Sequence, residues 1–215
     1  MIRLTKSPCP AELQTALHTK RQEYEQLEGS GTPIPKALAS FYGRKEIKDL
    51  LMAETQQKCA YCESKIQHID YGDVEHIRPK DLGATFRFDF GNLTIACGVC
   101  NTNKSNHEDV LNPYVTDPSD HLVALGPMIM RKPGSDLGLT TEKRLKLNRA
   151  ALLERRSERL EALSALLDQA ARVSNAGVKK VLLEQAAKEC EGDKEYSMVV
   201  RAFLEKLIPH VGAAD

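Results

Sequence analysis

The sequence predicts a mostly helical α+β protein in which a small cysteine-rich unit separates two helical regions. Three observations support this class. Apolar residues recur at helical spacing toward both ends of the chain. Between about residues 58 and 112 this periodicity stops, and turn residues, four cysteines and short apolar runs replace it. Two short apolar runs around Gly126 and Pro127 then predict one β-hairpin.

We therefore divide the chain into an N-terminal helical segment, a compact core, and a C-terminal region of hairpin and helices, with the bounds 1–55, 56–112 and 113–215. The N-terminal segment is expected to hold helices over 10–28 and 36–55, separated by "GSGTPIP". Pro10 suits the first turn of a helix. Three C-terminal helices are expected at roughly 141–173, 176–190 and 194–208.

Composition sets limits on function. The 215 residues are 41% hydrophobic and 28% charged, with a formal net charge of zero, so any contact with a polyanion must rest on local basic patches. No apolar run is long enough to predict a membrane span. The first residues lack the apolar segment of a secretory signal, so we expect a cytoplasmic protein. In that compartment, clustered cysteines indicate metal ligands or redox centres.

One stretch of the C-terminal region is strongly basic. Residues 142–160 carry seven lysine and arginine side chains against three glutamates. The simpler interpretation is a solvated helix face with ion pairs three and four residues apart. The alternative is contact with phosphates or with an acidic partner.

Four of the six cysteines form two CxxC pairs, "CAYC" and "CGVC", at Cys59, Cys62, Cys97 and Cys100. Each pair lets two thiolates reach one ion from a tight turn, and two such turns complete a tetrahedral zinc site. Four protein ligands leave no open position, so this Zn²⁺ is predicted to be structural. A redox CxxC and four buried free thiols are the alternatives. The doubled spacing and the lack of a βαβ context argue against both.

Between and just after the two pairs lie "EHIRPK", "GNL" and "CNTNKS". The order Glu75-His76, then Asn92, then Asn101 and Lys104 resembles the HNH endonuclease superfamily, whose fold is called ββα-metal. The two CxxC pairs are typical of its zinc-bearing branch. Asn101 stands where that branch usually has His, and Glu75 stands where Asp is usual.

A closer resemblance extends over most of the chain. The stretches "MIRLTKSPCPAEL", "LNPYVTDPSDHL" and "TEKRLKLNRAALLERR", together with the motif segments, resemble the HNH nucleases of Septu-type and retron-associated antiphage systems. The first and last of these stretches lie outside the nuclease motif. The resemblance implies that the nuclease works beside an ABC-type ATPase subunit. We expect the flanking helices to dock that subunit or to form a homodimer.

The expected activity is metal-dependent hydrolysis of DNA phosphodiesters. Hydrolysis needs an activated water and neutralised charge. A neutral His76 suits the role of general base. Glu75 and Asn101 are oxygen ligands suited to Mg²⁺ or Mn²⁺. Asn92 is expected to hold the loop that orients His76, and Lys104, one helical turn past Asn101, to contact phosphate.

The sequence allows alternatives for the strand geometry, for the acidic metal ligand and for the function. Neighbouring residues of a strand point to opposite faces, so Glu75 and His76 share one site only if the strand bends, for which Gly72 and Pro79 are suitable flanks. Asp73 is the alternative metal ligand, since it lies on the same strand face as Glu75. The alternative function is a non-catalytic zinc module that binds nucleic acid or protein.

Overall fold

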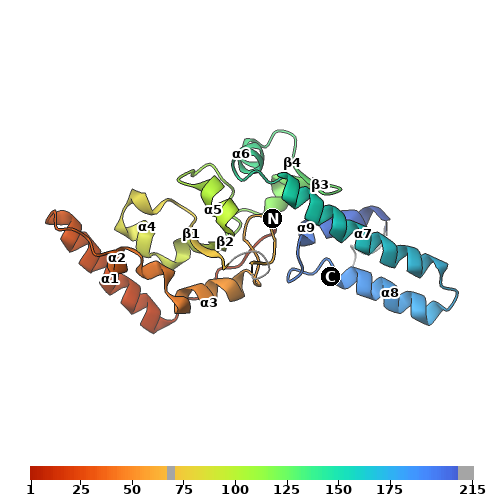
Figure 1. The fold of residues 1–215 in the computed structure, drawn as a ribbon, viewed down its shortest axis with the longest axis horizontal. Helices are drawn as coiled ribbons and strands as arrows, with labels where there is room; N and C mark the ends of the chain where they lie inside the picture. Colours follow the sequence, from red (N-terminus) through yellow and green to blue (C-terminus); the bar gives the residue numbers. More distant parts are fainter. Residues whose placement is uncertain (67–70, 208–215) are drawn as a thin grey trace.

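A computed structural model describes residues 1–66 and 71–207 of the chain. The molecule is elongated, with the N-terminal helices at one end, the last long helices at the other, and the cysteine-rich unit between them (Figure 1). Helices predominate and the sheets are small, so the predicted α+β class is confirmed. None of the described helices combines the length and the apolarity that crossing a membrane requires.

The N-terminal segment contains α1 (Ala11–Gly29), as expected, but the predicted second helix is broken into three pieces. These are α2 (Lys36–Ala39), the 3-10 turn η1 (Phe41–Gly43) and α3 (Lys45–Glu54). The backbone at Arg44 is extended, and glycine before it disfavours a continuous helix. The break matters because it brings η1 into contact with the first strand of the core.

The core is a ββα unit. β1 (Asp73–His76) pairs antiparallel with β2 (Leu93–Ala96), and α5 (Gly98–Lys104) follows β2 directly and contacts both strands. The connection between the strands contains α4 (Ala84–Phe88) and the 3-10 turns η3 (Lys80–Leu82) and η4 (Phe90–Asn92). Every residue of β2 is buried, as expected for a strand covered on both faces.

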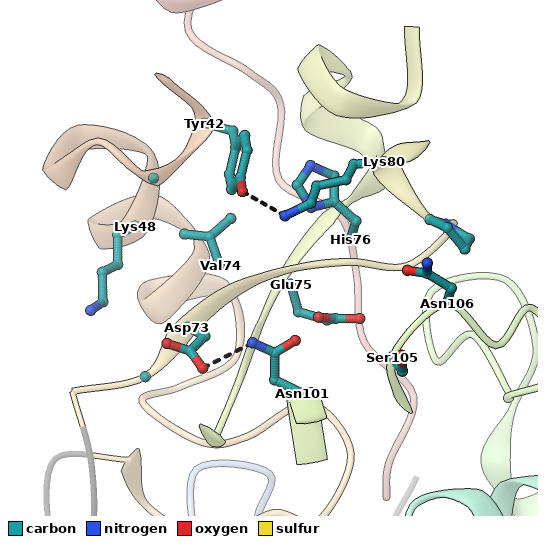
Figure 2. Close-up of a pocket in the computed structure, with 13 residues that line it drawn as sticks. Tyr42, Lys48, Asp73, Val74, Glu75, His76, Lys80, Asn101, Ser105 and Asn106 are labelled. Atoms are coloured by element: carbon teal, nitrogen blue, oxygen red, sulfur yellow. Dashed lines mark hydrogen bonds between the residues drawn. The ribbon is translucent and has the colours of Figure 1, made fainter. Parts of the chain in front are cut away.

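The expected bend in the first strand is absent. The antiparallel register runs without interruption from Asp73 opposite Ala96 to His76 opposite Leu93. Glu75 and His76 therefore extend to opposite sides of β1, as strand geometry requires. Both still line one pocket, because the pocket extends to both sides of the strand (Figure 2).

The predicted hairpin is present as β3 (Leu122–Leu125) and β4 (Met128–Arg131), after the 3-10 turn η5 (Pro118–Asp120). The single helix expected at 141–173 is instead two, α6 (Asp136–Arg144) and α7 (Ala150–Arg172). Lys146 between them has a positive φ of 49°, which no α-helix contains. The last helices are α8 (Ala176–Lys188) and α9 (Ser197–Leu207), and residue 208 of the expected third helix lies outside the described residues.

One hydrophobic cluster draws on all three parts of the chain that the sequence suggests. It includes Leu17 and Ile47 from the N-terminal helices, Leu93 from the core, and Leu145 and Val199 from the C-terminal region. A second, smaller cluster of Leu163, Ala186, Val200 and Leu204 holds α7, α8 and α9 together. The three-part division stays a prediction, but the parts pack on a shared interior.

Candidate metal centre and active-site pocket

The four cysteines of the two CxxC pairs come together in the middle of the molecule. Cys59 and Cys62 lie on the turn after α3, Cys97 directly precedes α5, and Cys100 lies in the first turn of α5. All four are buried free thiols, and their sulfur atoms lie within 4.8 Å of one another. Among the residues that the structure describes, no other group of three or more His, Cys, Asp or Glu side chains is arranged to share an ion.

The spacing of the sulfurs fits zinc. Sulfurs placed about 2.3 Å from a tetrahedral Zn²⁺ lie about 3.8 Å apart, and Cys62 Sγ is 3.9 Å from Cys97 Sγ. Hydrogen bonds from neighbouring thiols, first that of Cys100, hold the pKa of Cys62 well below its usual value, whereas burial holds the pKa of Cys59 well above it. Zn²⁺ bound here would be held by four protein ligands and would act structurally.

The cluster has polar contacts outside the four ligands. The Arg149 guanidinium, just before α7, lies 3.7 Å from Cys100 Sγ through each of two nitrogens and 3.9 Å from Cys97 Sγ. The Ser64 hydroxyl lies 3.3 Å from Cys62 Sγ. Four thiolates around Zn²⁺ carry a net negative charge, so a half-buried arginine beside them supplies the opposite charge.

The C-terminal region also contacts the first cysteine turn directly. The Ser197 hydroxyl donates to Glu63 Oε2 at 2.7 Å, and the Tyr196 and Ser64 hydroxyls are 3.0 Å apart. The buried Lys58 ammonium donates to the Lys194 carbonyl at 2.9 Å. The start of α9 is therefore held against the cysteine turn by buried polar contacts as well as by apolar packing.

A pocket of about 480 Å³ lies beside β1 (Figure 2). Its walls come from η1, α3, β1 and its flanks, η3, and α5 with the residues after it. Its charged and polar lining side chains include Tyr42, Lys48, Asp73, Glu75, His76, Lys80 and Asn101. The lining is predominantly polar, which suits a charged ligand rather than an apolar one.

His76 is held in one tautomer. Its Nε2 lies 3.1 Å from the main-chain carbonyl of Arg87, which only accepts hydrogen bonds, so Nε2 carries the proton and Nδ1 keeps its lone pair. The ring also makes an edge-to-face contact with Tyr42, with 4.4 Å between centroids. Burial, opposed by the bond to Arg87, lowers the pKa of His76 to about 4, so the imidazole is neutral near pH 7.

Asn92 organises the loop around His76. Its side-chain oxygen accepts from the Arg78 amide at 2.8 Å, and its side-chain nitrogen donates to the carbonyls of Arg78 at 2.9 Å and Phe86 at 2.8 Å. Its own carbonyl accepts from the Ile77 amide at 2.9 Å. Asn92 thereby joins the end of β1 to α4, which carries the carbonyl that binds His76.

On the other side of β1, oxygen atoms gather around Asn101. The Asn101 amide nitrogen donates to Asp73 Oδ2 at 2.9 Å, which leaves its side-chain oxygen turned toward the Glu75 carboxylate (Figure 2). Burial raises the pKa of Glu75 to about 7, although the Lys104 ammonium opposes the shift. The Asn101 side-chain oxygen and the Glu75 carboxylate face each other, and oxygen acceptors of this kind suit a hard divalent cation. Asp73 lies beside them through its hydrogen bond to Asn101.

The structure gives Lys104 a different place from the one that we predicted. Its side chain is buried, and its ammonium lies 3.0 Å from Glu75 Oε1 and donates to the His76 carbonyl at 2.9 Å. A buried ammonium with two partners is not available to a phosphate in the pocket. Lys104 instead connects α5 to the two adjacent residues of β1 that the sequence marks as functional.

The ββα core, the cysteine cluster and most of the pocket lie in a part of the chain that is similar to a known family. Residues 59–107 match the HNH endonuclease family. Two relatives share similarity with a larger part of the chain, and both carry the name Septu protein PtuB. The relative from Bacillus thuringiensis is 35% identical over 115 residues, which cover 51% of this chain and 44% of the relative. The one from Bacillus mycoides is 32% identical over 152 residues, which cover 54% and 52%. The chain thus spans about half the length of the curated relatives that it matches.

Sequence reasoning missed four side chains at these sites: Tyr42, Lys48, Lys80 and Arg149. The first two precede the family match, so no motif marked them. Lys80 is part of the quoted "EHIRPK", but its position beside the pocket depends on the turn after Pro79. Arg149 belongs to the basic stretch, whose surface members form ion pairs such as Arg155 with Glu158, as the simpler interpretation expects.

We predict that Arg149→Ala weakens zinc binding by roughly ten- to a hundredfold, because the thiolates lose a charge-compensating donor. Competition with a chromogenic chelator, together with the zinc content of the purified protein, measures the effect. Arg155→Ala is the matched control, since Arg155 lies on α7, which begins directly after Arg149, and forms an exposed ion pair with Glu158. Equal zinc affinity for wild type and Arg149→Ala would contradict the role of Arg149.

Proposed function

We propose that this protein is a divalent-metal-dependent DNA endonuclease of the HNH class and the nuclease component of an antiphage defence complex in the cytoplasm. The observation that carries the proposal is His76. A neutral imidazole of defined tautomer lines a polar pocket beside an oxygen ligand set, within the residues that match the HNH family. The similarity to the Septu proteins supports the defence role.

In this proposal His76 is the general base. With Nε2 occupied by the Arg87 carbonyl, Nδ1 is the atom that accepts a proton from the attacking water. A pKa of about 4 keeps the ring unprotonated before the substrate arrives. A phosphate anion in the pocket favours the imidazolium form and so raises the pKa toward the range where a base is effective. Asn92 acts indirectly, because it positions α4 and therefore the Arg87 carbonyl that binds His76.

Glu75 and Asn101 would hold the catalytic Mg²⁺ or Mn²⁺. Bound there, the cation supplies charge neutralisation at the phosphate and at the leaving oxygen. Lys104 keeps the Glu75 carboxylate oriented and, through the His76 carbonyl, holds the main chain of the base at the same time. The two functional residues of β1 thus depend on one lysine of α5 for their position.

We predict that His76→Ala lowers the rate of plasmid nicking by roughly 10²–10⁴-fold, the usual contribution of a general base. The assay uses the protein together with its partner ATPase and either Mg²⁺ or Mn²⁺. His18→Ala, on α1 and outside the pocket, is the control. Equal nicking by wild type and His76→Ala would refute the assignment. Phage protection that survives His76→Ala would favour the non-catalytic zinc module.

We predict that Glu75→Gln raises the Mn²⁺ concentration needed for half-maximal nicking by at least about tenfold, because the cation loses a charged ligand. Asp73→Asn is the comparison, since Asp73 reaches the ligand set through its hydrogen bond to Asn101. Its effect is expected to be smaller. The opposite order of effects would make Asp73 the acidic ligand.

The partner in this proposal is an ABC-type ATPase, which the resemblance to Septu-type nucleases implies. The best surface for it is the outer face of α8, where Val178 and Val181 are 48% and 61% exposed. This helix lies beside α7 at the end of the elongated molecule opposite α1, away from β1 (Figure 1). Docking there would leave the path to the active site open.

We predict that Val178→Ser with Val181→Ser abolishes co-purification with the ATPase, because the contact loses its apolar area. Lys179→Ser with Lys180→Ser, on the same helix, is the control and is expected to retain the partner. Light scattering of the free protein tests the homodimer on the same variants. If the valine variant loses self-association while still binding the ATPase, this face is a homodimer contact instead.

A further inference from the structure

One wall of the active-site pocket comes from outside the residues that match the HNH family. Tyr42 and Gly43 of η1 and Lys48 of α3 line the pocket, whereas the family match begins at residue 59. These residues are placed precisely, because Ile47 and Leu51 on the inner side of α3 are fully buried in the main core. The N-terminal helices therefore contribute directly to the site.

Lys48 differs from the neighbouring cations of this segment. Lys45 pairs with Asp49 at 2.5 Å and Arg44 pairs with Glu46 at 3.3 Å, so their charges are compensated within the segment itself. Lys48 is half-buried against the pocket, and in the described part of the chain its ammonium has no ion-pair or hydrogen-bond partner. An uncompensated cation held beside a polar pocket is a ready contact for an anion.

Tyr42 separates Lys48 from a second cation. The Lys80 ammonium donates to the Tyr42 hydroxyl at 3.0 Å, and the Tyr42 ring contacts His76. Figure 2 shows the two lysines on opposite sides of Tyr42, with Lys48 toward the Asp73 end of β1 and Lys80 toward the His76 end. The candidate metal ligands Glu75 and Asn101 lie on the other side of the strand.

This division of charge fits an extended polyanion. The cation held by the carboxylate side would engage the phosphate that is cleaved, and the lysine side would face the phosphates before and after it. Because the whole chain is electrically neutral, binding cannot rely on the overall field and has to use such local contacts. Lysine suits this role as a point charge that neutralises phosphate without reading sequence.

We propose that Lys48 binds a backbone phosphate of the nucleic-acid strand next to the one that is cleaved, so that α3 forms part of the substrate-binding surface. This inference rests on the proposed nuclease function and adds a residue that the family match does not contain. It also gives the N-terminal segment a task in the reaction, in addition to its part in the shared core.

The test measures binding of a fluorescein-labelled DNA duplex by anisotropy over a series of salt concentrations. It uses the full chain with its partner and carries His76→Ala in every sample to prevent cleavage. Adding Lys48→Ala is expected to weaken binding roughly three- to tenfold and to reduce the slope of log K against log salt by about one, the signature of a lost phosphate contact. Lys48→Arg, which keeps the charge, is expected to retain most of the affinity.

Lys45→Ala is the matched control, because Lys45 is on the same helix, is fully exposed and does not line the pocket. Equal affinity and slope for the Lys48→Ala and Lys45→Ala variants would overturn the inference. Nicking by the chain with an intact His76 separates this from the proposed function. If that chain cuts DNA and Lys48→Ala cuts with an unchanged KM, only the role of Lys48 fails. If it binds DNA without cutting, the nuclease proposal fails and the salt slope still decides the role of Lys48.

Discussion

The cluster of four cysteine thiols is the constraint on which the rest of this structure depends. In the residues that the structure describes between the two CxxC pairs, there are only two four-residue strands and short helical turns, too little to be stable through their own hydrophobic burial. The cluster joins the turn after α3 to the start of α5, and so fixes β2 and α5 relative to the N-terminal helices. Zn²⁺ binding at such a site contributes directly to folding free energy.

Buried polar contacts, as well as apolar packing, connect the cysteine cluster to the candidate active site. Cys100 and Asn101 are consecutive on α5, and Lys104 one turn later holds both Glu75 and the His76 main chain. Breaking a buried ion pair by removing one partner costs roughly 3–5 kcal/mol, because the other charge is left without compensation. The geometry of the candidate active site is therefore coupled to the integrity of the cysteine cluster.

The regions outside the ββα core contribute residues to the cysteine cluster and to the pocket. The C-terminal region supplies Arg149 to the thiol cluster and holds the first cysteine turn through Tyr196 and Ser197. The N-terminal region supplies Tyr42 and Lys48 to the pocket. The part of α7 and α8 that extends away from this interior is free for another task, which agrees with the exposed valines on α8.

The sequence by itself determined the fold class, the hairpin and the zinc-type cysteine cluster, because helical periodicity and CxxC spacing are local patterns that short segments carry unaided. It also marked His76, Glu75, Asn92 and Asn101, since they fall in recognisable order between and just after the cysteines.

Only the tertiary structure decided what those residues touch. The contact of Arg87 with His76, the burial of Lys104 under Glu75, and the approach of Lys48 and Arg149 join residues that are distant in sequence. Such contacts depend on where whole helices pack, and no local pattern encodes them. The breaks at Arg44 and Lys146 escaped prediction because the apolar helical spacing continues through both, although Gly43 precedes the first break and the second requires a positive φ at Lys146.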